Sequence, residues 1–395
     1  PNVGGLNEYL LDISTSKTYN KIKGDVWNVL GKLNRISPGM RNFIQNIDNS
    51  IKSMLLKKSN LFEAMGLRYF GPVDGHDIHH LIKILRDLKN IPGPKVLHCI
   101  TVKGKGFKEA EINQTIWHAP GKFNKVTGER IKENNPNIPA KFQDVFGNTV
   151  TELAKSNSKI IGITPAMPTG CSLNIMMHEM PDRCFDVGIA EQHAVSMAAG
   201  MARGGYRPYF AVYSTFLQRA YDQIVHDVCL QNLPVCILSD HVGLVGDDGK
   251  THHGVLSVPM LMSIPNLTLL APRDTRQIRQ AVRATLKLDG PCVVQYPKEG
   301  IEPYAQNVTG EPFAVGKWQT LIPGGQDAVI LAYGRMTQNA IQASELLVQR
   351  GLSVGVIDCC SLKPLDMDCL RALFERKAKI VTIEEGEMIG GFGSE

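Results

Sequence analysis

The feature that most constrains the fold is a regular alternation, over residues 159–296, of short continuous Val/Ile/Leu runs with amphipathic helical segments. Strands with one face in water alternate apolar and polar residues, whereas continuous apolar runs are typical of parallel strands that are buried on both faces. The pattern predicts strands at 159–164, 184–189, 208–213, 234–239, 267–271 and 292–296, and helices at 191–203, 216–231 and 274–286. We therefore expect an α/β unit with a parallel sheet covered by helices on both faces.

The same rhythm occurs on both sides of this unit. Before it, we expect a helix from Asp77 that ends before Gly93-Pro94, a strand over 96–100, and a further helix that begins near Lys141. After it, the pattern predicts strands at 327–333, 353–358 and 379–384 and helices at 337–350 and 366–375. Polar, Gly/Pro-rich stretches at 119–140 and 299–326 are interpreted as linkers. Residues 1–70 are interpreted as irregular, with two helices around 41–56 and 60–65.

These breaks divide the 395 residues into three units, at 1–140, 141–305 and 312–395. We expect residues 1–60 to be mobile, because they are polar and glycine-punctuated. The last unit stops directly after the Gly-rich segment Gly390–Gly393, which would leave its sheet with an unfinished edge. We therefore expect the sequence to be a piece of a longer protein.

Composition excludes several function classes. The net charge of +5 is small and scattered, which gives little support for nucleic-acid binding. No apolar run reaches the roughly 18 residues that a membrane span requires. The nine cysteines lie mostly in apolar strand-like runs, and none form a Cys-x-x-Cys motif, so we interpret them as reduced core residues of a cytoplasmic protein. Anionic small molecules remain possible ligands.

Four polar segments follow predicted strands, where ligands bind in open parallel sheets. They are Lys103–Phe107 with His118 soon after, 186–193, 213–223 and 240–254. Each residue has an ordinary explanation when it is taken alone: Glu191 could stabilise a helix N-terminus, His118 could be a surface residue, and Asp248 and His252 could be turn residues. His76, His79 and His80 have a helical spacing that could bind a metal, as could His241 with His252-His253, but neither group has a suitable ligand set and we expect no metal there.

Taken together, the segments Gly71-Pro-Val-Asp-Gly-His-Asp77, Asp186-Val-Gly-Ile-Ala-Glu-Gln-His193, Tyr213-Ser-Thr-Phe-Leu-Gln-Arg-Ala-Tyr-Asp222 and Val245-Gly-Asp-Asp-Gly-Lys-Thr-His252 resemble the 1-deoxy-D-xylulose-5-phosphate synthase family. The resemblance covers essentially the whole sequence. It implies a multi-domain, transketolase-like α/β fold with parallel sheets, whose first and last domains are incomplete here. It also implies a cytoplasmic homodimer that uses thiamine diphosphate and Mg²⁺.

The activity that the resemblance implies is a decarboxylating transfer of a two-carbon unit from pyruvate to D-glyceraldehyde 3-phosphate. The products are 1-deoxy-D-xylulose 5-phosphate and carbon dioxide, and the reaction opens the non-mevalonate route to isoprenoid precursors and also supplies thiamine and pyridoxal synthesis. No nucleic acid or membrane partner is implied.

The family's site residues are carried over position by position. Glu191 matches the glutamate that contacts a ring nitrogen of the cofactor's aminopyrimidine, and Phe216 matches the ring that stacks on that pyrimidine. Phe107 and Lys103 fall at cofactor-contacting positions. The implied catalytic set is completed by residues that face the substrate: His118, His252 and Asp248. Tyr213 and Arg219 are implied to line the same cleft.

Two positions depart from the family pattern. Two arginines usually hold the acceptor phosphate, but His241 and Lys298 stand at these positions. Lysine loses the bidentate fork of arginine, and a neutral histidine loses most of its charge. We therefore expect a weakened preference for phosphorylated over plain glyceraldehyde.

A third departure concerns the diphosphate and magnesium motif, a Gly-Asp-Gly segment with an Asn about thirty residues later at the end of the next strand, a spacing set by one βαβ unit. The sequence lacks it, and residues 1–5 match the stretch directly after that Asn. We expect the metal ligands to lie in a segment before Pro1, and this sequence alone neither to bind the cofactor tightly nor to turn over.

Three alternatives stay open. The sequence could belong to another thiamine-dependent ketolase, or to the beta subunit of a 2-oxo-acid dehydrogenase, whose partner chain carries the diphosphate motif. Residues 1–120 count against the beta subunit, which would not begin with such a segment. A non-catalytic homologue would explain His241 and Lys298, but not the retention of Glu191, His118 and Asp248.

Overall fold

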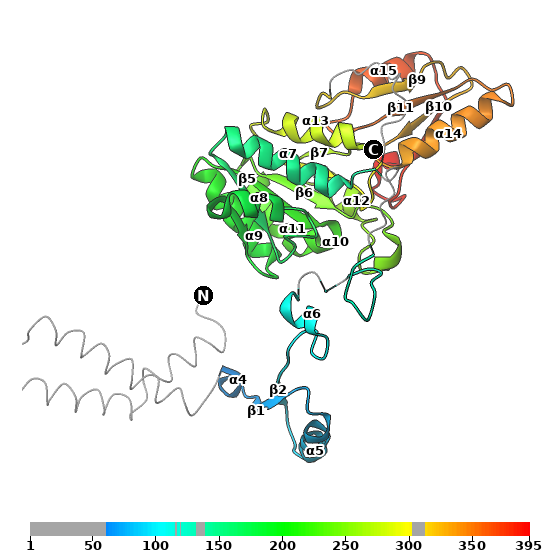
Figure 1. The fold of residues 1–395 in the computed structure, drawn as a ribbon. Coiled ribbons are helices and arrows are strands. Elements are labelled where there is room, and N and C mark those ends of the chain that lie inside the picture. The colour runs from blue at the N-terminus through cyan, green and yellow to red at the C-terminus, as the bar shows by residue number, and fades with distance from the viewer. Residues whose placement is uncertain (1–60, 115–116, 119, 132–138, 302–312) are drawn as a thin grey trace, which may run out of the picture. The chain divides into compact units, whose positions relative to one another are not determined.

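The computed structural model describes residues 61–114, 117–118, 120–131, 139–301 and 313–395 (Figure 1). The helix predicted at 41–56 and the mobility expected of residues 1–60 lie outside the described residues. The chain divides into two compact units, 1–134 and 135–395, and each is described by itself. No helix among the described residues is long and apolar enough to cross a membrane.

The first unit contains a small βαβ motif. Strand β1 (Arg68–Asp74) pairs in parallel with β2 (Lys95–Ile100), and α5 (Ile78–Lys89) connects them. The side chain of Asp77 caps α5 by accepting from the backbone N–H of His80 at 3.0 Å. The sequence predicted α5 and β2 but not β1, because Gly71-Pro72 interrupts its apolar run and proline is unfavourable inside strands. The short helices α4 (Leu61–Ala64) and α6 (Lys108–Ile112) flank the motif, and α6 was not predicted.

The second unit is built on a seven-stranded sheet with the order β12-β7-β8-β6-β5-β3-β4. The pairs are parallel, as predicted, except for β12 against β7. In chain order the strands are β3 (Ile160–Thr164), β4 (Cys184–Asp186), β5 (Arg207–Tyr213), β6 (Cys236–Asp240), β7 (Thr268–Leu270), β8 (Cys292–Gln295) and β12 (Ser361–Lys363). β12 was not predicted, and it brings a segment from far along the chain to the edge of this sheet.

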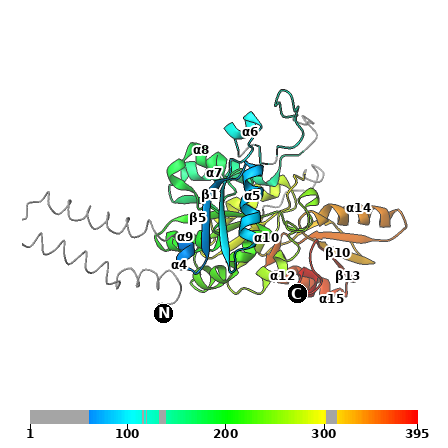
Figure 2. The ribbon, with the colours of Figure 1, turned by 90° about the horizontal axis from the view of Figure 1, so that it is seen from below.

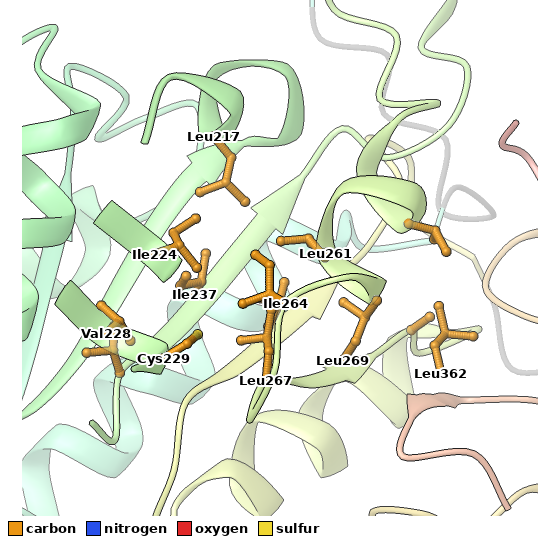
Figure 3. Packing of buried hydrophobic residues seen from close by; sticks show 14 of the residues in the cluster. Leu217, Ile224, Val228, Cys229, Ile237, Leu261, Ile264, Leu267, Leu269 and Leu362 are labelled. Atoms are coloured by element: carbon orange, nitrogen blue, oxygen red, sulfur yellow. The ribbon is translucent and has the colours of Figure 1, made fainter. Parts of the chain in front are cut away.

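Helices cover both faces of the sheet, as the continuous apolar runs predicted (Figure 1). One face packs against α7 (Phe142–Ser156), α8 (Asn174–Glu179) and α13 (Thr275–Thr285). The other packs against α9 (Glu191–Arg203), the helical segments over 214–229, and α12 (Ser257–Met262). Leu217, Ile224, Ile237, Leu261 and Leu269 of this second face are fully buried (Figure 3). Each such side chain contributes roughly 1.5–3 kcal/mol relative to an exposed one.

A four-stranded sheet, ordered β13-β10-β11-β9, completes the second unit. Its strands are β9 (Gln319–Ile322), β10 (Ala328–Ala332), β11 (Val354–Asp358) and β13 (Ile380–Ile383), and its helices are α14 (Met336–Val348) and α15 (Met367–Glu375). These elements lie together at one end of the unit (Figure 2). The interpretation of 299–326 as a linker is wrong at β9, which pairs antiparallel with β11.

A buried ionic network joins the two sheets. The guanidinium of Arg273, just after β7, pairs with the carboxylate of Asp358 at the end of β11. Asp358 Oδ2 also accepts from Gln277 Nε2 at 2.7 Å. Burial raises the pKa of Asp358, and Arg273 and Gln277 oppose that shift. Removing one partner of such a pair costs about 3–5 kcal/mol because it leaves a buried charge uncompensated.

Two further sequence predictions need correction. The helix predicted at 216–231 begins at Ser214 and is a succession of short α, 3₁₀ and π segments: α10 (Ser214–Leu217), η2 (Gln218–Ala220), α11 (Tyr221–Gln223) and η3 (Ile224–Cys229). The spacing of apolar residues locates a buried face, but it does not distinguish hydrogen bonds to i+3, i+4 or i+5. The strand predicted at 184–189 ends at Asp186, whose Oδ1 accepts from the backbone N–H of Gly188 at 2.9 Å and turns the chain toward α9.

All nine cysteines lie within the described residues and are free thiols, and seven of them are buried. This confirms the interpretation of most cysteines as core residues.

Candidate active site

The polar segments of the second unit meet at one edge of its large sheet. Glu191 follows β4, Tyr213 ends β5, His241 follows β6 and Lys298 follows β8. Since these four strands run parallel, their carboxyl ends lie at the same edge, where open sheets bind ligands.

Glu191 is the first residue of α9 and is only 4% exposed. Its Oε1 lies 3.5 Å from Nη1 of Arg219, whose own side chain is largely exposed. The carboxylate is thus held rigidly and kept from bulk water.

An aromatic cluster lies beside this pair. The guanidinium carbon of Arg219 is 5.3 Å from the ring centroid of Phe216. The Phe216 ring meets the imidazole of His252 edge-on at 5.4 Å, and it stacks on Tyr213 at 5.7 Å. The Nδ1 atom of His252 is 2.9 Å from the hydroxyl of Thr251, which fixes the orientation of its ring.

His241 is a buried residue with a left-handed backbone, φ +61°. Its Nδ1 lies 2.9 Å from Oδ1 of the fully buried Asp240, and its ring stacks on Tyr213 with centroids 3.9 Å apart. Burial raises the pKa of Asp240, and the neighbouring imidazole and backbone N–H of His241 oppose that shift. Because Asp240 holds Nδ1, the imidazole presents Nε2 to Asp248, with 3.8 Å between Nε2 and Oδ2.

Asp248 also accepts a hydrogen bond from Lys298 Nζ. Burial disfavours the charged form of this carboxyl, but the hydrogen bond and charge of Lys298 outweigh that effect, so its pKa lies below the usual value. At neutral pH the two side chains form an ion pair, and each side chain is about one-third exposed, at 32%.

Eight residues singled out in the sequence therefore form one continuous line of contacts. In spatial order they are Glu191, Arg219, Phe216, His252, Tyr213, His241, Asp248 and Lys298. A cleft opens beside the Glu191 end of this line, between the start of the 214–229 segment and the loop after β6. Its lining consists of Thr215, Phe216, Gln218, Arg219, Lys250, Thr251, His253, Val255 and Leu256.

Three predicted site residues lie in the first unit. Phe107 packs against Trp117 and Phe123, with ring centroids 4.8 and 5.8 Å away, in an aromatic cluster of that unit. Lys103 and His118 are exposed.

Sequence reasoning missed two residues that shape the site. Asp240 was seen only as part of a polar segment, although its carboxylate orients His241. The hydroxyl of Ser214 donates to the backbone carbonyl of His241 at 2.8 Å and so supports the same loop. A carboxylate that directly precedes a histidine at a strand end could have indicated the contact between Asp240 and His241. Nothing in the sequence indicates the contact between Ser214 and the His241 carbonyl.

A parallel sheet with a buried glutamate and an aromatic cluster at its carboxyl edge, joined to a smaller mixed sheet, defines a transketolase-like protein. Three family models match: "1-deoxy-D-xylulose-5-phosphate synthase" over residues 1–101, "Transketolase, pyrimidine binding domain" over 139–302, and "Transketolase, C-terminal domain" over 316–395. The chain belongs to the 1-deoxy-D-xylulose-5-phosphate synthase family.

Curated relatives agree along the whole chain. It is 48% identical to the 1-deoxy-D-xylulose-5-phosphate synthase of Cytophaga hutchinsonii and 45% identical to that of Parabacteroides distasonis, and both similarities cover 100% of this chain. The chain spans 62% of the length of each relative.

Solved structures support the same fold. A split-gene transketolase, described as an inactive beta4 tetramer, has a TM-score of 0.58 at 28% identity. The similarity covers 65% of this chain and 83% of the transketolase chain. The R525L transketolase of Pichia stipitis has a TM-score of 0.53 at 16% identity, covering 63% and 39%, and shows the fold alone.

Proposed function

We propose that the full-length protein transfers a two-carbon unit from pyruvate to D-glyceraldehyde 3-phosphate, releasing carbon dioxide and forming 1-deoxy-D-xylulose 5-phosphate. The observation that carries this proposal is the continuous line of side chains from the buried Glu191 to Lys298. A carboxylate at one end suits cofactor activation, and a cation beside polar groups at the other suits a phosphorylated acceptor. The family membership supports the same reaction.

The residues at the Glu191 end fit thiamine diphosphate. A buried carboxyl group beside an aromatic ring and an open cleft is the chemistry that an aminopyrimidine needs, namely one group that can share a proton with a ring nitrogen and one flat apolar surface. Glu191 would hold a ring nitrogen and Phe216 would stack on the ring, with Phe107 and Lys103 as further contacts. When bound, this cofactor serves as an electron sink for the carbanion chemistry.

Magnesium is proposed as the companion of the cofactor's diphosphate, with ligands that lie outside the described residues. Within those residues, no group of three or more His, Cys, Asp or Glu side chains could hold a metal ion.

His252, His118 and Asp248 are proposed to handle protons and orient the acceptor. The Thr251 contact at Nδ1 of His252 leaves the other ring nitrogen to exchange a proton with a substrate oxygen. Asp248, ionised by its pairing with Lys298, can accept from an acceptor hydroxyl. Tyr213 stays protonated because burial raises the pKa of its phenol. Together with Arg219, which lines the cleft, it is proposed to contact the substrate.

The acceptor end is proposed to bind phosphate more weakly than two arginines would. Lys298 is already paired with Asp248, and His241 lies between the carboxylates of Asp240 and Asp248. The positive potential left for a phosphate is therefore smaller than the two side chains alone would suggest.

Three further parts of the proposal concern organisation. We propose domain boundaries at 1–140, 141–305 and 312–395, a homodimer in solution, and a cytoplasmic location. The dimer is tested by measuring the molar mass of the full-length protein by light scattering during size-exclusion chromatography. We expect twice the mass of one chain. A molar mass of one chain at micromolar concentration would contradict the dimer.

The activity is tested by incubating full-length protein with pyruvate, D-glyceraldehyde 3-phosphate, thiamine diphosphate and Mg²⁺. Stoichiometric carbon dioxide and 1-deoxy-D-xylulose 5-phosphate are expected. A ketose formed from sugar-phosphate donors instead would indicate a transketolase, and transfer of the acyl group to a lipoyl acceptor would indicate a 2-oxo-acid dehydrogenase. A folded protein that binds the cofactor but forms no product would indicate a non-catalytic homologue.

A further inference from the structure

The loop after β6 carries two of the proposed substrate-facing residues and is closed at its base. The backbone N–H of Gly254 donates to the carbonyl of Gly243 at 2.8 Å, and these two residues form a β-bridge. Residues 244–253, called here the acceptor loop, lie between them and include Asp248 and His252. The position of both side chains therefore depends on how the base of this loop is held.

Arg335, which directly precedes α14 in the small sheet's part of the unit, reaches this base. Its Nη2 donates to the backbone carbonyl of Leu244, the first residue of the acceptor loop, at 3.2 Å. Its Nη1 lies 3.2 Å from Oε2 of Glu299, the neighbour of Lys298. One guanidinium thus contacts the acceptor loop and the turn that presents Lys298.

Glu385, which follows β13, fixes that guanidinium. Its carboxylate receives a fork from Arg335: Nε lies 3.1 Å from Oε2, and Nη2 donates to Oε1. The pair is largely shielded, with exposed side-chain fractions of 29% for Arg335 and 18% for Glu385. A planar fork of two parallel hydrogen bonds sets the orientation of the guanidinium, which a single contact would not do.

The same carboxylate also packs against the loop base directly. Gly243 has φ +79°, and a Cβ atom added there would lie 2.4 Å from Oε2 of Glu385. The backbone at Gly243 and Leu244 is therefore in contact with both members of the ion pair, Glu385 and Arg335. The close approach and the left-handed backbone together explain why glycine occupies this position.

The charges around Arg335 argue for a geometric rather than a binding role. Four of its five N–H donors bond to two carboxylates and a carbonyl, so little positive potential remains for a ligand. We propose that Arg335, oriented by Glu385, is a positioning residue that holds the acceptor loop and the Lys298 turn in the geometry required for the acceptor substrate. The kinetic part of this inference rests on the proposed function, and the structural part does not.

Hydrogen–deuterium exchange tests the structural part without any substrate. Arg335→Met removes the donors and keeps most of the side-chain length. We expect peptides that cover 243–254, above all the N–H of Gly254, to exchange about tenfold faster than in the parent protein. The matched control is Arg371→Met on α15, which removes an exposed arginine 3.2 Å from Asp368 and leaves this exchange unchanged. Equal exchange over 243–254 in the two folded variants would overturn the proposal.

Steady-state kinetics on the full-length protein test the second part. In Arg335→Met, we expect the KM for D-glyceraldehyde 3-phosphate to rise about tenfold, while the KM for pyruvate and the affinity for thiamine diphosphate stay within about twofold. Arg335→Lys can still reach the Leu244 carbonyl but cannot form the fork. Its KM for D-glyceraldehyde 3-phosphate should therefore lie between those of the parent protein and Arg335→Met. A uniform loss of activity with unchanged substrate KM values would contradict a positioning role. If the parent protein lacks the proposed activity, the proposed function fails, and the exchange result still decides the structural part.

Discussion

The imidazole of His241 stacks on the phenol ring of Tyr213, with centroids 3.9 Å apart and planes inclined by 26°. Asp240 holds the Nδ1 side of this imidazole, so the ring is fixed on one face and at one edge. At the proposed phosphate-binding position, the chain therefore presents a single ring nitrogen toward Asp248 instead of a guanidinium fork.

Restoring both arginines should strengthen phosphate recognition. We expect the double variant His241→Arg/Lys298→Arg to raise the ratio of kcat/KM for phosphorylated over plain glyceraldehyde by about 10- to 100-fold, because each charge-assisted bidentate contact adds roughly 1.5–3 kcal/mol at most. A guanidinium can also stack on Tyr213 in place of the imidazole. Lys155→Arg, at an exposed pair with Glu179, is the control. An unchanged or smaller ratio would show that these positions do not determine phosphate selectivity.

Replacing the carboxyl group of Glu191 should abolish most turnover. Glu191→Gln keeps the size of this 4% exposed side chain but replaces a carboxyl group, which can exchange a proton, with an amide, which cannot. We expect kcat of the full-length protein to fall by about 10²- to 10⁴-fold, the range typical of a lost acid–base contact. Glu179→Gln, at the exposed salt bridge with Lys155, should retain parental activity. Activity of Glu191→Gln within threefold of the parent would remove Glu191 from the proposed catalytic set.

The Asp248–Lys298 pair should give a defined pH dependence of stability. The pKa of Asp248 is lowered in the folded state, so the pair stabilises the fold at pH values above about 4, the ordinary value for aspartate, and this contribution is lost as the pH falls through the lowered value. We expect Lys298→Met to melt below the parent protein at pH 7, and the difference to shrink as the pH falls below about 4. The effect should stay below about 1 kcal/mol, because solvent screens a pair with this exposure.

Lys250→Met, a change of the same type at an exposed residue of the acceptor loop, controls for net charge. A difference in melting temperature between Lys298→Met and the parent protein that increases as the pH falls would contradict the prediction, because the ion pair is lost when Asp248 is protonated.

The sequence was sufficient for the large parallel sheet, because strands buried on both faces require continuous apolar runs. It was insufficient for β1, β9 and β12, which are short or interrupted by proline and whose pairing partners lie far along the chain. Local patterns carry no information on such pairings. The same limit applies to the contact between Arg335 and the Leu244 carbonyl, which joins residues 91 positions apart.

For the candidate site, sequence motifs brought together eight residues that the fold places in one line of contacts, because all of them follow strands of the same sheet. The buried partner of His241 was not predicted. The sequence pattern ended this strand at 239 and so placed Asp240 in the polar loop, whereas in the structure Asp240 is the last residue of β6 and is buried.

A final prediction concerns the base of the acceptor loop. Gly254 is buried, and a Cβ atom added there would lie 2.1 Å from the hydroxyl of Ser214 and 2.4 Å from the carbonyl oxygen of His241. Because that carbonyl belongs to the backbone and already accepts from Ser214, it cannot move without displacing His241. We expect Gly254→Ala to lower stability by about 1–3 kcal/mol, the usual cost of overpacking, and to raise the KM for the acceptor.

The matched control is Gly200→Ala in the last turn of α9, where nothing lies within 4 Å of the added atom. This change should stabilise the protein by up to about 1 kcal/mol, since alanine is the better helix former. Thermal unfolding of the two variants beside the parent protein measures both effects, with opposite signs expected. A Gly254→Ala variant that melts at or above the parent temperature would mean that the loop base can relax, and that the close packing of Gly254 against His241 does not hold the acceptor loop in place.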